Sequence, residues 1–156
     1  MEWKTEEGIS SGYREKGFFP EAVINFLALL GWNDGTDKEL FSLDELVAAF
    51  DLNRVHKSGA KFDPEKNKWF NHQYLQKQNN SDLAKAYSIV LHEKGIEVDN
   101  DKLELLVSLI KERAHFVSEF WELSNFFFNA PTSYDEKASK NWNADTPRLL
   151  QELISV

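Results

Sequence analysis

The chain has 156 residues, a formal net charge of −8 and no cysteine. Its hydrophobic content of 42% is sufficient for a folded core and excludes a disordered chain, while the absence of cysteine excludes disulfide bonds and thiolate zinc sites. The acidic excess argues against general binding to nucleic acids, so any contact with RNA must come from a local basic patch.

A helix is predicted from Pro20 to Leu30. Proline suits the first helical position, where its missing N–H costs nothing, and Gly31 suits a left-handed residue just after the last turn. Apolar residues occupy nearly every face of this segment, and only Glu21 and Asn25 are polar. We therefore expect a helix that is buried almost all round and forms the central element of the core.

A second helix is predicted after a capping box. Ser42 and Glu45 have the S-x-x-E spacing, and Phe41 precedes the box where it can pack against Leu46. One apolar stripe follows at helical spacing: Leu43, Leu46, Val47 and Phe50. This stripe predicts packing beside the first helix.

Residues 54–77 form the one clearly basic segment. Its positive side chains are Arg54, Lys57, Lys61, Lys66, Lys68 and Lys77. Asp63 and Pro64 predict the N-cap and first residue of a third helix, which reaches about Gln76. Its apolar side is marked by Trp69, Phe70 and Tyr74. Its polar side is expected to project Lys68, Asn71 and His72.

The polar stretch 76–81 is predicted to separate two modules, with the boundary near Gln78, because few apolar contacts could cross it. Two helices are expected beyond it, and Gly95 should end the first of them. Their apolar stripes are Leu83, Tyr87, Val90 and Leu91, and then Leu103, Leu106, Val107 and Ile110. A further short helix should contain Phe116, Phe120, Trp121 and Leu123.

The C-terminal part begins with three consecutive aromatic residues, Phe126 to Phe128, which we interpret as a compact plug in the core. Thr146 and Pro147 predict the start of a last helix. That helix has an apolar stripe without a C-terminal stop signal, so we expect either a continuation into a larger domain or a partner that covers it.

Motifs for catalysis are missing from the sequence. It has no G-x-x-x-x-G-K phosphate loop, no dinucleotide fingerprint and no G-x-S-x-G elbow. His92 and Glu93 could begin a zinc-protease pair, but Ile96 stands where the second histidine is needed. The four histidines lack ligand spacing, so we predict neither a catalytic residue nor a metal ligand.

Two blocks of sequence resemble one enzyme family. The stretch from Gly12 to Trp32 reads G-Y-R-E-K-G-F-F-P-E-A-V-I-N-F-L-A-L-L-G-W, and the second reads K-S-G-A-K-F-D-P-E-K from Lys57, followed by W-F-N-H-Q-Y from Trp69. Both resemble the region after the signature lysine loop of bacterial glutamate-tRNA ligases, which are class I aminoacyl-tRNA synthetases. The H-I-G-H-like and K-M-S-K-S-like catalytic elements of such enzymes are absent, so we expect an inactive fragment whose catalytic half lies upstream of Met1.

The resemblance implies a mainly α fold with at most minor short strands. The polar residues 1–11 show no sustained period and are interpreted as a loop or a short edge strand. The resemblance further implies a stem-contact module over 1–78 and the first, truncated part of an α-helical anticodon-binding domain over 79–156. The parent enzyme would use ATP and magnesium to attach glutamate to its tRNA, whereas the fragment itself would hold no cofactor. We expect a cytoplasmic monomer that binds glutamate tRNA, with neither DNA nor a membrane as partner.

The resemblance also implies residues that contact tRNA. In the basic segment these are Lys57, Ser58, Lys61, Lys66, Lys68, Asn71 and His72, which could bind phosphates or ribose hydroxyls; an ordinary solvated helix face is the alternative. In the second module, Arg113 of the pattern Lys111-Glu112-Arg113 is implied to approach an anticodon base, unless it forms a salt bridge to Glu112 or Glu119. The rival function is an acidic helical module for protein–protein interaction, favoured by exposed aromatic residues such as Trp142.

Overall fold

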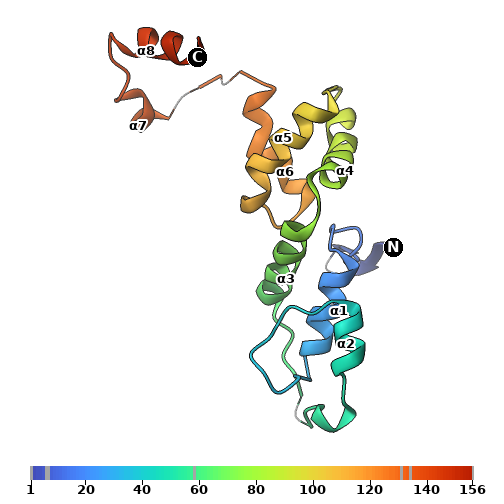
Figure 1. Cartoon of the computed structure of the whole chain (residues 1–156). Coiled ribbons are helices and arrows are strands. Elements are labelled where there is room, and N and C mark those ends of the chain that lie inside the picture. Colours follow the sequence, from blue (N-terminus) through green and yellow to red (C-terminus); the bar gives the residue numbers. More distant parts are fainter. Residues whose placement is uncertain (1, 6–7, 58, 131, 134, 156) are drawn as a thin grey trace. The chain divides into compact units, whose positions relative to one another are not determined.

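The computed structural model describes residues 2–5, 8–57, 59–130, 132–133 and 135–155. Two short antiparallel strands, β1 (Glu2–Thr5) and β2 (Gly8–Ser11), pair with Glu2 opposite Ser11, and the other elements of the described ranges are helical (Figure 1). The prediction of a mainly α fold with at most minor strands is therefore confirmed. The chain divides into two compact units, Met1–Asn125 and Phe126–Val156.

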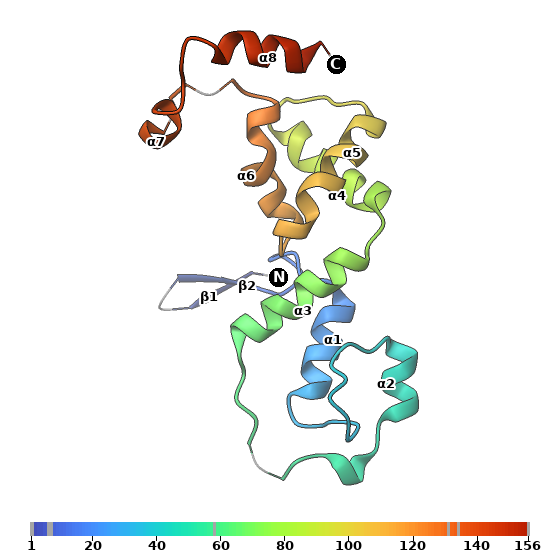
Figure 2. The same cartoon turned by 60° about the vertical axis from the view of Figure 1, so that its left-hand side comes forward.

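The described residues of the first unit form six α-helices in two groups. They are α1 (Pro20–Leu29), α2 (Leu43–Ala49), α3 (Pro64–Lys77), α4 (Asn80–Glu93), α5 (Asn100–Ile110) and α6 (Phe120–Ser124). Helix α1 packs against α2 and α3, while α4, α5 and α6 pack against one another (Figure 2). Short 3-10 helices are η1 (Leu52–Arg54), η2 (Lys111–Arg113), η3 (Val117–Glu119) and η4 (Asn125–Phe127). The second unit holds α7 (Glu136–Ser139) and α8 (Thr146–Ile154).

Helix α1 begins at Pro20 as predicted, but it is not buried all round. Ala22, Asn25 and Phe26 are buried, whereas the side chains of Ile24 and Leu27 are 42% and 50% exposed. Among the residues that the structure describes, α1 packs mainly against α2 and α3. The expectation of a fully enclosed helix was therefore wrong, because apolar residues on every face do not guarantee neighbours on every face.

The end of α1 also differs from the prediction. Leu30 has a right-handed helical conformation and Gly31 does not adopt a positive φ. The Gly31 carbonyl accepts a hydrogen bond from the His56 N–H at 2.8 Å, and Trp32 pairs with Val55 in an isolated antiparallel bridge. Since the chain continues directly into this pairing, no left-handed residue is required at Gly31.

A buried polar cluster joins α1, α3 and the segment before α2. Asn25, which is fully buried, accepts a hydrogen bond from the Phe41 N–H at 2.9 Å through its Oδ1. The Tyr74 hydroxyl lies 2.9 Å from the same oxygen and 2.5 Å from the Phe41 carbonyl oxygen, so it can donate to either acceptor. Burial raises the pKa of Tyr74 and keeps this hydroxyl a donor at physiological pH.

The predicted capping box of α2 is confirmed. Ser42 Oγ accepts from the Glu45 N–H at 3.2 Å, and Glu45 Oε2 accepts from the Ser42 N–H at 2.8 Å. Phe41 and Leu46 are buried in one cluster with Trp32, as the stapling contact requires. The rest of the predicted stripe is exposed: Leu43, Val47 and Phe50. That part of the prediction was wrong, since α2 contacts its neighbours mainly through Leu46.

The capping box should make stability depend on pH. A hydrogen bond from the Lys38 ammonium, 2.7 Å away, and one from the Ser42 amide lower the pKa of Glu45. A lowered folded-state pKa stabilises the fold above the unfolded-state pKa, and this stabilisation is lost as the pH falls through the folded-state value. We expect Glu45→Gln to melt below the wild type at pH 7, with a difference that shrinks below about pH 4.

Thermal melting from pH 3 to pH 7 would test this expectation. Glu97→Gln is the matched control, because Glu97 is exposed and has no ion pair in the described part of the chain. Equal melting temperatures for Glu45→Gln and the wild type at pH 7 would contradict the role given to the capping carboxylate.

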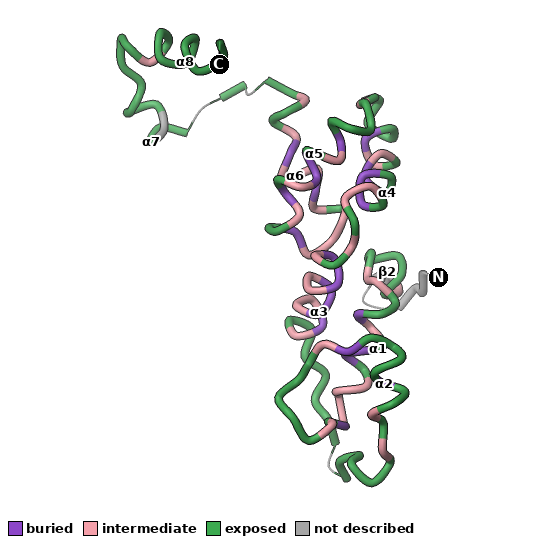
Figure 3. Tube along the Cα trace, viewed as in Figure 1, coloured by how far each residue is buried: buried purple, intermediate pink, exposed green. Residues whose placement is uncertain are grey.

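The core between α4, α5 and α6 follows most of the predicted stripes, but Val90 is only half-buried. The prediction that Phe116 lies in the short helix was wrong, because Phe116 is extended and precedes η3. Leu83, Tyr87 and Leu91 are buried on α4, and Gly95 ends the helix region with a φ of +71°. All four predicted residues of α5 are buried: Leu103, Leu106, Val107 and Ile110. Phe120 of α6 is fully buried and meets the Tyr87 ring edge-on at 5.5 Å. Figure 3 shows that α4, α5 and α6 each carry buried stretches.

Two C-terminal features are largely exposed. Phe126 and Phe127 are 60% and 55% exposed, so the prediction of an aromatic plug in the core was wrong. Helix α8 begins at Thr146 as predicted and has no buried residue (Figure 3). Within the described ranges, no helix combines the length and apolar character needed to cross a membrane.

Candidate nucleic-acid interface

The loop before α3 carries two exposed lysines of the basic segment. Lys57 and Lys61 are exposed, and neither has an ion pair or side-chain hydrogen bond among the residues that the structure describes. Ser58, predicted beside them, lies outside the described residues. Lys61 also borders a small hollow whose lining includes Glu39 and Lys66. The free ammonium groups of Lys57 and Lys61 are the side chains in this loop best suited to bind phosphate.

Two other predicted lysines have acidic partners. Lys66 forms a salt bridge with Glu39 and lies 4.9 Å from the centroid of the Trp69 ring, while Lys68 Nζ is 3.8 Å from Glu119 Oε1. Such partly exposed pairs contribute little to stability, and an incoming phosphate can compete for the cation. Lys66 and Lys68 are thus weaker phosphate candidates than the free lysines, because their charge is already balanced.

Asn71 does not project to solvent, so this part of the α3 prediction was wrong. The residue is fully buried. Its Oδ1 accepts from the Phe19 N–H at 2.8 Å, and its Nδ2 donates to the His115 carbonyl at 2.6 Å. The amide therefore links the start of α1 to the segment after α5, and we withdraw it from the set of RNA-contacting candidates.

His72 is only partly accessible. Its Nδ1 lies 2.7 Å from the Ala114 carbonyl oxygen, and because a carbonyl can only accept, Nδ1 must carry the proton. The ring lies 5.1 Å from the ring of His115. The hydrogen-bonding capacity of Nδ1 is thus used inside the protein, and only Nε2 remains for a ligand.

Arg113 is the residue predicted to approach an anticodon base. It is exposed at the end of η2, and its guanidinium has no hydrogen bond or ion pair within the described ranges. The alternative salt bridge to Glu112 or Glu119 is not formed. Glu119 instead accepts from the His115 N–H at 2.7 Å and approaches Lys68. All five donors of the guanidinium are consequently available.

Sequence reasoning missed two residues that fix the surroundings of Arg113. Gln76 Nε2 donates to the Lys111 carbonyl at 2.5 Å. Lys111 Nζ lies 3.4 Å from the Gln76 carbonyl and 3.3 Å from the Gln78 carbonyl, at the C-terminal end of α3. A cation is favourable at a helix C-terminus. Here Lys111 provides the cation for the end of α3, and because it lies 33 residues after Gln78, no local sequence pattern indicates this contact.

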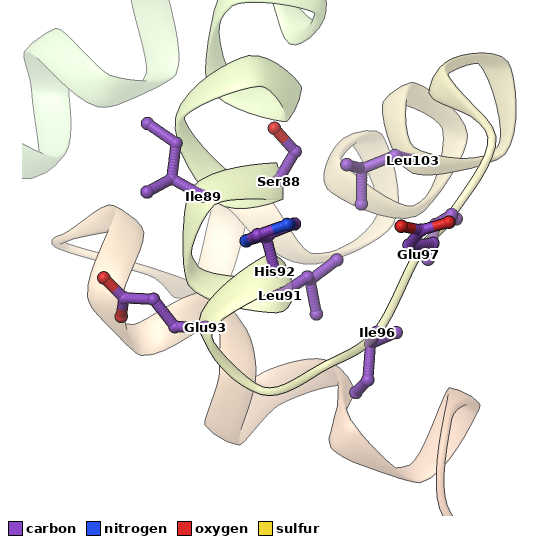
Figure 4. A pocket seen from close by; sticks show the side chains of 9 residues that line it. Ser88, Ile89, Leu91, His92, Glu93, Ile96, Glu97 and Leu103 are labelled. Carbon is purple, nitrogen blue, oxygen red and sulfur yellow. The ribbon is translucent and has the colours of Figure 1, made fainter.

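A separate hollow lies beside α4 and α5 and is lined by Ser88, His92, Glu93, Glu97 and neighbouring apolar side chains (Figure 4). Its two carboxylates would repel phosphate, so this hollow is not suited to bind an RNA backbone. In the part of the chain that the structure describes, no group of three or more histidine, aspartate or glutamate side chains could hold a metal ion.

Comparison with known proteins agrees with the resemblance found in the sequence. The glutamate-tRNA ligases of Flavobacterium johnsoniae and Flavobacterium psychrophilum are 77% and 64% identical to the chain over all 156 residues. A crystal structure of the glutamate tRNA ligase of Elizabethkingia meningosepticum, in complex with its amino acid, has a TM-score of 0.88 and 46% identity over 98% of the chain. The chain spans about 31% of the length of each of these proteins.

Two family models divide the chain between them. Residues 4–69 match the catalytic domain of class I tRNA synthetases (E and Q), and residues 70–156 match the anticodon binding domain. The second match begins within α3, just before Asn71, and includes Arg113. The predicted similarity to bacterial glutamate-tRNA ligases is thereby confirmed. The chain belongs to the anticodon binding domain family through residues 70–156. Its residues 4–69 are a segment similar to the catalytic domain of class I tRNA synthetases (E and Q).

Proposed function

We propose that this chain binds glutamate tRNA as part of a glutamate-tRNA ligase. The main support is the free, exposed guanidinium of Arg113 within a segment that matches an anticodon binding domain. A planar guanidinium suits bidentate bonding to, or stacking on, an unstacked loop base. In this role Arg113 checks the anticodon.

The loop before α3 supplies contacts of another kind. Lys57 and Lys61 bind phosphates of the tRNA stem, while Lys66 and Lys68 add weaker contacts when they leave Glu39 and Glu119. Phosphate contacts carry no sequence information but fix the register of the RNA. The module 1–78 then holds the stem, and the module 79–156 reads the anticodon arm.

The whole protein would attach glutamate to its tRNA with ATP and magnesium. The contribution of this chain is positional, because correct placement of the tRNA brings its acceptor end to the active site. We place the protein in the cytoplasm and expect this chain to be monomeric.

A salt-titrated binding assay against glutamate tRNA and a non-cognate tRNA tests this function. Removing two phosphate contacts with Lys57→Ala/Lys61→Ala should reduce the slope of log K against log salt by about 1.5 for both tRNAs. Arg113→Ala should instead lower the preference for the cognate tRNA about tenfold, as for loss of one base contact.

Lys85→Ala/Lys102→Ala is the matched control, because it removes two exposed lysines from α4 and α5 and changes the net charge equally. It should leave the salt slope unchanged. Absence of binding at low salt would contradict the proposal and favour the rival, a helical module that binds protein.

A further inference from the structure

The segment that carries Arg113 is attached to α3 by a series of side chains. Gln76 donates to the carbonyl of residue 111, His72 to that of 114, and Asn71 to that of 115. As the residue number of the acceptor rises from 111 to 115, the residue number of the donor on α3 falls from 76 to 71. The segment therefore runs antiparallel to α3. We call residues 111–115 the Arg113 turn.

Further bonds hold the turn at both sides of Arg113. Lys111 Nζ bonds back to the Gln76 and Gln78 carbonyls. Ala114 is fully buried, and its N–H donates to the Lys111 carbonyl at 3.2 Å. The residues on either side of the recognition position are thus fixed, while the arginine side chain itself is free.

These contacts have a consequence for recognition. An arginine side chain has many rotamers. Its preference for one base therefore depends on a backbone that is held in a fixed position. A group held in place by neighbouring hydrogen bonds loses less freedom when it binds. The same helix carries Lys66 and Lys68 and follows the loop with Lys57 and Lys61, so α3 sets the distance between the phosphate contacts and the anticodon contact.

We infer that Gln76 and His72 are positioning residues for Arg113, which hold the Arg113 turn on α3 without touching the tRNA. This inference rests on the proposed function, because it concerns how the anticodon contact is placed. It replaces the earlier expectation that His72 contacts the RNA directly.

Hydrogen exchange on the full chain provides the first test. Gln76→Met keeps side-chain length but removes the donor, and Gln73→Met is the control, since Gln73 lies on the same helix with no side-chain hydrogen bond among the described residues. Gln76→Met and His72→Leu should speed amide exchange in residues 111–115 on the order of fivefold, as expected for one lost hydrogen bond. Gln73→Met should not, and His72→Asn, which retains a donor near the Nδ1 position, should largely restore protection.

Binding to glutamate tRNA and to the same tRNA with an altered anticodon provides the second test. Gln76→Met should reduce the preference for the unaltered anticodon roughly three- to tenfold, and adding it to Arg113→Ala should reduce that preference no further, because both act through one contact. Unchanged exchange, an equal loss of affinity for both RNAs, or full additivity with Arg113→Ala would overturn the inference.

The failure of the two proposals can be told apart. If no variant or wild-type chain binds either RNA, the proposed function fails. If the lysine variants change the salt slope but Arg113→Ala leaves the anticodon preference intact, tRNA binding stands and the positioning roles of Gln76 and His72 are refuted.

Discussion

Replacing Asn71 by alanine should lower the free energy of unfolding by about 2–4 kcal/mol, one of the largest effects expected for a polar residue in this chain. The substitution removes the acceptor of the Phe19 N–H and the donor to the His115 carbonyl. Both groups are partly buried, and an unsatisfied buried group costs roughly 1–3 kcal/mol. Urea denaturation at neutral pH would measure the change.

Gln73→Ala is the appropriate control for Asn71→Ala. It shortens a polar side chain on the same helix that has no hydrogen bond in the described part of the chain, so its effect should stay within about 0.5 kcal/mol. A loss below about 1 kcal/mol for Asn71→Ala would mean that water replaces both hydrogen bonds, and that Asn71 does not fasten α1 to the segment after α5.

Local rules predicted most of the helices correctly. The Ser42 and Glu45 capping box, the Asp63 N-cap and the stop at Gly95 each depend on atoms within a few residues of one another. The stripe of α5 was predicted correctly because a helix buried along one side shows that side directly in its spacing. In these cases the local signal and the tertiary environment agree.

The failures share one physical cause, which is dependence on partners distant in the sequence. Asn71 was predicted to project into solvent, yet it is buried because the His115 carbonyl, from a distant segment, accepts a hydrogen bond from its amide. The amide of Asn25 is buried for a similar reason, because it accepts from the Phe41 N–H. Conversely, Leu27 and Val47 are exposed because no element within the described ranges covers their side of the helix. Periodicity shows which residues share a face, but it does not show whether that face has a partner.

The candidate site shows the same division. The sequence identifies the basic segment and Arg113, but not that Glu39 balances Lys66 or that Glu119 approaches Lys68 from 51 residues away. The proposed division near Gln78 stays a prediction, and three side chains of α3 form hydrogen bonds across it to the Arg113 turn. If the two modules contact the stem and the anticodon arm separately, they are therefore connected by the helix α3 and its hydrogen bonds and not by a flexible linker.

Phe120→Ala should destabilise the chain by about 3–5 kcal/mol, because it opens a cavity where the ring is fully buried against Tyr87. Tyr87 would lose its edge-on aromatic contact. Its hydroxyl lies 2.6 Å from Ser124 Oγ, and this hydrogen bond would weaken because Phe120 no longer anchors α6, the helix that carries Ser124. Phe127→Ala is the matched control seven residues later. Since the Phe127 ring is 55% exposed, its loss should cost no more than about 0.5 kcal/mol. Denaturant unfolding of both variants would decide between the structure and the sequence-based expectation, because a core plug at Phe126 to Phe128 requires the two costs to be similar.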